Sequence, residues 1–332
     1  MMRWRSGARA RRRARPGDGA DRVATTVHRL AVLLAAGVAP AAAWRHLAEA
    51  GPADRGDARI GDGVAGPPVV SVAADAAARG ADVAGAIVAH VGAVGDPGAL
   101  GWRAVAAGWT VAERAGSPIA GMLRDTAGTL RDLAALQRDL DATLAGPRAT
   151  ARLVALLPPA GVGLGMVLGF DPLGVLIGSP LGVAAGATGA GLLLAARAWS
   201  RALADRAARP DPAPGLAMDL LAIALAGGAS VARARASVDA ALRACLPEVH
   251  AGPEADDAVE LSRRAGVPVA ELLRAEAGQA RLAARAAGQA RAAALAVQLM
   301  APLALCTLPA FVLLGVVPML ASVVASTLAD LS

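Results

Sequence analysis

"AGSPIAGMLRDTAGTLR", residues 115–131, recurs later in the chain as "AGVPVAELLRAEAGQAR", residues 265–281. When Arg114 and Arg264 are included, ten of eighteen aligned positions are identical. Gly116 and Pro118 match Gly266 and Pro268, and each copy leads into a long apolar run. Self-similarity over such a distance is the signature of duplicated structural units. The sequence therefore predicts one helical unit that occurs twice, each time ahead of a hydrophobic segment.

Further landmarks repeat in the same order. "LAVLLAAGV" (30–38) aligns with "LAIALAGGA" (221–229), and both apolar runs contain a Leu-Pro step, at 157–158 and 308–309. Between the first two landmarks the first copy is 41 residues longer, which places an insertion near residues 50–100. The start of this insertion, "GPADRGDARIGDGVAGPP", is expected to be a loop because Gly, Pro and Asp dominate it.

The repeated Gly-x-Pro has a local physical explanation. Gly116 can adopt the left-handed conformation that ends a helix, Ser117 can cap the next helix, and Pro118 suits a first helical turn. After this junction the apolar residues recur at helical spacing. That stripe consists of Ile119, Leu123, Ala127, Leu130 and Ala134, and in the second copy of Val269, Leu273 and Ala277. We expect small antiparallel helix bundles, one per copy.

Composition indicates a membrane protein. The chain has 55% hydrophobic residues and a mean hydropathy of +0.49, which is too apolar for an ordinary soluble domain. Residues 153–196 contain one charged residue, Asp171, next to Pro172, and this pattern predicts a hairpin of two spans, 153–170 and 173–196. A third, proline-kinked span is expected from about residue 303 to 324.

The distribution of arginine predicts the topology. All 33 basic residues are arginine, with 20 in residues 1–152 and 13 in residues 197–291. Both arginine-rich segments should lie on the cytoplasmic side, so three spans place the N-terminus inside and the C-terminus outside.

The predicted fold is all-α, with three transmembrane helices and two repeated cytoplasmic helical bundles. Its parts, listed in chain order, are a basic disordered tail (1–24), the first bundle (25–150), a transmembrane hairpin (151–197), a linker (198–212), the second bundle (213–291) and the third transmembrane region (292–328). The predicted localisation is the cytoplasmic membrane, with several spans.

A secretory signal peptide is an alternative explanation of the N-terminus. Arginines precede the apolar stretch from Leu30, and the small residues Ala41 and Ala43 resemble a cleavage site. Two observations oppose this interpretation: export would place many arginines outside, and the stretch has its internal counterpart at 221–229.

Candidate chemistry is sparse. The four histidines lack metal-ligand spacing, and Cys245 and Cys306 fall in segments of different character, so neither a metal site nor a disulfide is expected. The predicted spans contain no paired acids or activated nucleophile, and no GxxxxGK phosphate loop occurs. We therefore predict no catalytic, cofactor-binding or metal-binding residues and no cofactor.

Glycines at every fourth position, such as Gly161, Gly165 and Gly169, are expected to line a close helix contact within the membrane.

Three stretches together resemble the type II secretion F-domain family: the "AG-x-P" junctions, "GFDPLGVL" after the first span, and "LALCTLPAFVLLGVVPML" near the end. The last is similar to inner-membrane platform proteins of tight-adherence (Flp) pilus systems. The extra N-terminal spans expected of those platform subunits are missing, whereas three spans with two cytoplasmic domains resemble the platform subunits of type II secretion and type IV pilus systems.

The resemblance implies a non-enzymatic scaffold. Such a protein engages a cytoplasmic secretion ATPase, pilin or pseudopilin subunits and a paralogous platform subunit, within a homo- or hetero-oligomer in membrane lipid. The matching positions Gly116, Pro118, Gly266, Pro268 and Pro309 would then have structural roles. A transporter or permease component is the alternative. A third hypothesis, a binder of nucleic acid or lipid surfaces, rests on the eight arginines before Val23; no specific nucleic-acid partner is expected.

Overall fold

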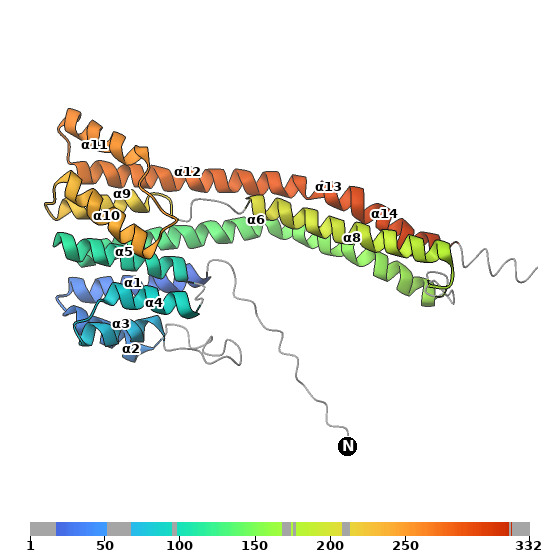
Figure 1. Cartoon of the computed structure of the whole chain (residues 1–332), viewed down its shortest axis with the longest axis horizontal. Helices are drawn as coiled ribbons and strands as arrows, with labels where there is room; N and C mark the ends of the chain where they lie inside the picture. The colour runs from blue at the N-terminus through green and yellow to red at the C-terminus, as the bar shows by residue number, and fades with distance from the viewer. Residues whose placement is uncertain are drawn as a thin grey trace, which may run out of the picture. The chain divides into compact units, whose positions relative to one another are not determined.

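The computed structural model describes residues 18–51, 68–94, 98–167, 174, 177–207, 213–318 and 320 (Figure 1). Within these ranges the chain is helical and contains no β-strand, so the all-α prediction is confirmed. The chain divides into two compact units, Met1–Arg138 with Asp211–Arg285, and Asp139–Pro210 with Ala286–Ser332.

The first unit contains helices from both repeat copies. In chain order they are α1 (Asp18–Ala35), α2 (Pro40–Ala50), α3 (Val69–Ala78), α4 (Val83–Val94), α5 (Ala99–Ala115), the start of α6 (Ile119–Val167), α9 (Leu216–Ala226), α10 (Val231–Cys245), α11 (Pro253–Ala265) and the start of α12 (Val269–Gln298). By the alignment of the copies, α1, α2, α5 and α6 correspond to α9, α10, α11 and α12. Helices α3 and α4 occupy the stretch in which the first copy is longer, and residues 52–67 of the expected loop lie outside the described residues.

One kind of turn recurs at five helix junctions of this unit. Each contains a glycine with φ between 63° and 85°, and the next helix begins three residues later. These glycines are Gly37, Gly80, Gly116, Gly228 and Gly266. At three of them the following amide donates to a carbonyl five residues back, as in Ser117 N to Ala112 O at 2.9 Å, which is the Schellman arrangement. The left-handed glycines predicted at 116 and 266 are confirmed.

The prolines of the two junctions begin the next helix in the same manner. Pro118 precedes α6, and its carbonyl oxygen accepts the amides of Gly121 and Met122 at 3.2 and 3.4 Å. Pro268 accepts the amides of Glu271 and Leu272 at 3.2 and 3.3 Å. The missing amide of proline costs nothing here because the first amides of a helix have no intrahelical acceptor.

The two copies share one hydrophobic core, which differs from the prediction of one bundle per copy. Most of the predicted stripes are buried. The first residues of the stripes, Ile119 and Val269, are partly exposed, whereas Leu123, Ala127, Leu273 and Ala277 have 0% exposure. These residues belong to a single cluster that contains side chains of both copies. Helix α5 explains this arrangement, because it packs against α1 and α4 of the first copy and also against α9 and α10 of the second. Helical periodicity identifies the buried face of a helix but not the helix that covers it.

The segment that resembles a signal peptide is part of this core. Leu30, Ala31, Ala43 and Trp44 are all fully buried. The Trp44 ring lies 5.8 Å from the ring of Trp109 in α5. Burial of Leu30 and Ala31 in the folded unit supports the interpretation of residues 30–38 as a repeat landmark. Residues 18–24, predicted as part of a disordered tail, belong to α1; residues 1–17 lie outside the described part of the chain.

The second unit has apolar side chains on its surface. It comprises the rest of α6 and α12, with α8 (Pro180–Ala207), α13 (Met300–Pro302), α14 (Leu308–Phe311) and two π-helical segments, η1 (Leu303–Thr307) and η2 (Val312–Val316). Its exposed large apolar residues include Leu153, Leu156, Val167, Ile177, Val183, Leu194, Val297, Met300, Leu305, Leu308 and Leu320. In the described part of the first unit, the exposed large apolar residues are Val32, Leu261, Val267 and Leu282.

One helical run in the described chain is long and apolar enough to cross a membrane, Val269–Val316, with a mean hydropathy of 2.2 over its most apolar window. The three predicted spans are thus not established. The first predicted span lies largely in α6 and the second largely in α8, whereas the turn at Asp171 and Pro172 lies outside the described residues. Helix α8 continues to Ala207, into the stretch predicted as a linker.

The predicted irregularity near Pro309 takes the form of π-helix. Pro302 and Pro309 precede η1 and η2, and α14 lies between these two segments. Proline removes one helical amide and crowds the carbonyl four residues back. Pro309 therefore acts on residue 305 within η1 and Pro318 on residue 314 within η2, where the turn is widened to π-helix. Gly161 of α6 and Gly189 of α8 face this region. A Cβ at Gly161 would lie 3.3 Å from the Phe311 ring, and one at Gly189 would lie 2.6 Å from Leu314 Cγ.

Alanine at Gly116 or Gly266 is expected to destabilise the first unit by about 1–2 kcal/mol, the cost of placing a Cβ residue in the left-handed region. Gly121 and Gly128 are matched controls because both lie inside α6, where an added Cβ would meet no atom within 4 Å. Alanine at a control should be neutral or stabilising by up to about 1 kcal/mol. Denaturant titration of the full chain in detergent, followed by tryptophan fluorescence, measures the difference, and equal effects at both kinds of site would contradict the role assigned to the turns.

Candidate functional site

A buried hydrogen bond joins the two repeat copies. The Ser117 hydroxyl, in the turn between α5 and α6, donates to the Ile223 carbonyl oxygen of α9 at 2.6 Å. Ser117 is 7% exposed, so the bond is shielded from water. This residue was predicted to cap α6, and the structure gives its hydroxyl a partner 106 residues away instead. The turn that ends α5 therefore also anchors the second copy.

The same contact requires a glycine on the other side. A Cβ at Gly227, which ends α9, would clash with the carbonyl oxygen of Ala115 and with the Ser117 hydroxyl. No side chain could occupy that position without separating the turn from α9. Gly227 and Ser117 together define the contact at which the copies meet, called here the inter-repeat contact.

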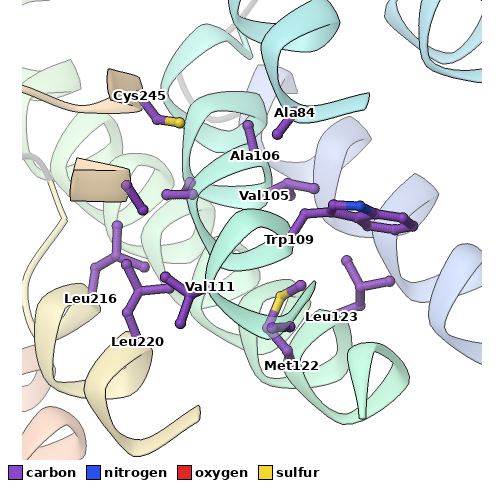
Figure 2. Close-up of a cluster of buried hydrophobic side chains, with 14 of the residues drawn as sticks. Ala84, Val105, Ala106, Trp109, Val111, Met122, Leu123, Leu216, Leu220 and Cys245 are labelled. Carbon is purple, nitrogen blue, oxygen red and sulfur yellow. The ribbon is translucent and has the colours of Figure 1, made fainter. Parts of the chain in front are cut away.

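Apolar side chains extend the inter-repeat contact along α5. Figure 2 shows Val111 directed toward Leu216 and Leu220 of α9, whereas Trp109 points to the opposite side of α5. Leu220 is 1% exposed and Val111 is fully buried. Cys245, at the end of α10, lies beside the same helix, and burial raises the pKa of its thiol. Helix α5 thus has two apolar faces, one for each copy.

Charged residues lie at the edge of this contact. Arg281 of α12 donates to Asp219 of α9 at 2.6 Å, and the side chains are 23% and 13% exposed. Burial raises the pKa of Asp219 and outweighs the attraction of Arg281, which acts in the opposite direction. The carboxylate is therefore costly to bury and depends on its partner. The pair joins the first and last helices of the second copy.

Further ion pairs link helices of this unit, and one of them joins Arg235 of α10 to Asp256 of α11. Arg138 of α6 pairs with Asp21 of α1, which joins the first and last helices of the first copy. Arg274 of α12 lies 3.9 Å from Asp125 of α6 and so connects the two copies. Its members are 44% and 54% exposed, so water screens this pair strongly.

The cavities near the contact are small. One of about 20 Å³ is lined by side chains of both copies, including Ala104, Asp125, Thr126, Asp219 and Leu220. Its volume suits about one water molecule. A second, of about 130 Å³, lies among α9, α10 and the start of α11. Small-molecule sites commonly measure about 300–1,000 Å³. Both cavities are thus smaller than a typical ligand pocket.

In the described part of the chain, no group of three or more His, Cys, Asp and Glu side chains is placed to hold a metal ion. The residues singled out by the repeat have conformational roles, with Gly116 and Gly266 in left-handed turns and Pro118 and Pro268 at helix starts. Sequence reasoning missed Gly227 and Asp219. The only available signal for Gly227 was the Gly-Gly pair at 227–228.

The comparisons with known proteins give no relative. No protein-family model matches the chain, and neither a curated protein nor a solved structure is significantly similar to it.

Arg281→Met is expected to lower the free energy of unfolding by about 2–3 kcal/mol, because it leaves the Asp219 carboxylate buried without its partner. Adding Asp219→Leu should restore most of the loss, since an apolar pair has no desolvation cost. Arg274→Met, at a more exposed pair, should cost below about 1 kcal/mol. The four proteins are compared by denaturant titration in detergent. A double variant as unstable as Arg281→Met would contradict the assigned cost of Asp219.

Titration of Asp219 should make the free energy of unfolding depend on pH in one direction. Because folding raises the pKa of Asp219 above 3.8, the folded state binds more protons than the unfolded state between the two values. The contribution of this group to stability is therefore greatest below pH 3.8 and is lost as the pH rises through its folded pKa. The double variant should lack this component.

Proposed function

We propose that this chain is a non-enzymatic platform protein of the cytoplasmic membrane, in a type II secretion or tight-adherence pilus system. The main support for this proposal is that the two units differ in where their apolar side chains lie. The first buries a conventional core assembled from both repeat copies, whereas the second exposes large apolar side chains along its helices. Exposed apolar surface on that scale is unusual for a soluble domain and favours contact with lipid.

The resemblance of the repeated junctions and of the C-terminal apolar run to the F-domain family supports the more specific part of the proposal. In this role the first unit faces the cytoplasm and contacts a secretion ATPase. The second unit crosses the membrane three times and contacts pilin or pseudopilin subunits and a paralogous platform subunit. The small cavities of the inter-repeat contact favour a mechanical role over a substrate site.

Affinity purification tests the role. The full chain, tagged and extracted in mild detergent from cells that contain the candidate ATPase, should retain that ATPase, and charge reversals on the surface of the first unit should release it.

Reporter fusions test the topology. Fusions at Pro172 and after Ser332 should report a location outside the cytoplasm, and a fusion at Pro210 should report the cytoplasm. Absence of the ATPase together with solute flux in vesicles that contain only this chain would contradict the platform role and favour a permease.

A further inference from the structure

The cavity of about 130 Å³ among α9, α10 and the start of α11, called here the α10 cavity, lies at a position that is filled in the first copy. Three of its lining residues replace large side chains of that copy, namely Arg235 for Trp44, Gly252 for Trp102 and Ala255 for Val105. In the first copy these large side chains are at most 5% exposed and belong to the core. The second copy is therefore hollow where the first copy has tryptophan.

The α10 cavity has an apolar floor and a charged rim. Leu221, Val238 and Ala255 are each at most 2% exposed, and they form the floor. Asp239 and Asp256 also line the cavity, and both are exposed. The corresponding residues of the first copy are both alanine. A molecule that matches this cavity has an apolar body and a charged head.

The rim is anionic. Arg235 forms an ion pair with Asp256, so this pair is neutral. In the described part of the chain Asp239, one turn further along α10, has no ion-pair partner. A Cβ at Gly252 would meet the carboxylate of Glu254, which places a third acidic group beside the cavity. Three carboxylates against one guanidinium favour a cation at this rim.

The wall of the α10 cavity also contains an unsatisfied donor. Arg235 Nε is buried and has no hydrogen-bond acceptor among the described residues. A buried donor without an acceptor destabilises a fold, and so does a void in a core. Departures from good packing that have no local compensation are expected at functional sites. The two features together indicate that the α10 cavity is a binding site.

We propose that the α10 cavity binds a small organic cation, a primary ammonium group on a short alkyl chain. The chain lies on Leu221 and Val238, and the ammonium group forms an ion pair with Asp239 at the rim. The apolar floor excludes a metal ion, which needs several oxygen or nitrogen ligands. A cavity of about 150 Å³ holds one benzene molecule, so 130 Å³ admits such a chain but no larger substrate.

A free amine and a lysine side chain of another protein present this same chemistry. The chain cannot supply the group itself, because all 33 of its basic residues are arginine. The inference does not depend on the platform role, since it concerns only the second copy within the first unit.

Cysteine labelling tests the charge of the site. Cys245 and Cys306 are replaced by alanine, and the cavity-lining residue Ala217 is replaced by cysteine. The full chain in detergent is treated with aminoethyl and with sulfonatoethyl methanethiosulfonate, and each rate is divided by the rate with 2-mercaptoethanol. The ammonium reagent should then react roughly tenfold faster than the sulfonate reagent. Equal corrected rates would overturn the proposal.

Protection by an amine tests binding. Butylammonium should slow labelling of the Ala217→Cys chain by the neutral methyl reagent, about tenfold at ten times its Kd. Butanesulfonate, which has the same chain and the opposite charge, should not. The matched control is Thr26→Cys, the counterpart of Ala217 in the first copy, whose labelling should be unaffected by butylammonium. Absence of protection at residue 217, or equal protection by butanesulfonate, would contradict the assigned ligand.

Two variants separate binding from folding. Asp239→Asn, at an exposed residue, should raise the Kd of butylammonium roughly threefold. The combination of Arg235→Trp, Ala255→Val and Asp256→Ala restores the side chains of the first copy and fills the cavity. It should keep or raise the unfolding midpoint, measured by circular dichroism, and abolish protection. Protection that persists in the filled variant, or a Kd unaffected by Asp239→Asn, would place the amine elsewhere and overturn the proposal.

Labelling in washed native membranes distinguishes the two sources of the ammonium group. If a lysine of a partner occupies the cavity, the Ala217→Cys chain should react more slowly in these membranes than after purification. If the ligand is a free amine, washing removes it and the two rates should be equal.

Discussion

The left-handed glycine turn is the constraint on which the first unit depends. Five helix junctions use it, and the interval from glycine to the next helix is the same at each. A fixed turn sets the direction in which one helix returns along its neighbour, so a short glycine motif can define an antiparallel helix pair. The same turn joins helix pairs in both copies, so duplication of one such pair can account for the helical architecture of the described part of the unit.

The contact between the copies depends on residues that differ between the two copies. Ser117 and Gly227 act together, because the hydroxyl reaches the Ile223 carbonyl only where α9 ends without a side chain. Their counterparts are Val267 and Ala36, so the contact cannot form identically at the free ends. Divergence between the copies thus distinguishes the internal contact from the outer surfaces.

The sequence predicted local features well, but it did not predict which helices and side chains contact one another. The turns at Gly116 and Gly266 and the buried stripe from Leu123 follow from conformational preference and periodicity, both of which act over a few residues. The shared core, the Ser117 hydrogen bond and the Asp219–Arg281 pair join residues that are far apart in the chain. Periodicity does not specify which helices pack together, so a single sequence favoured one bundle per copy. Gly189 was likewise missed, because its contact with Leu314 depends on the packing of α8 against η2.

Both repeat copies fold as one unit around α5. Native-state hydrogen exchange of the full chain in detergent, read by mass spectrometry, tests it most directly. Peptides from α5 and α9 should open with the same free energy and respond equally to denaturant, as expected for one cooperative unit. If the amides of α9 exchanged through a separate opening of much lower free energy while α5 stayed protected, the copies would be independent bundles and the account would be contradicted.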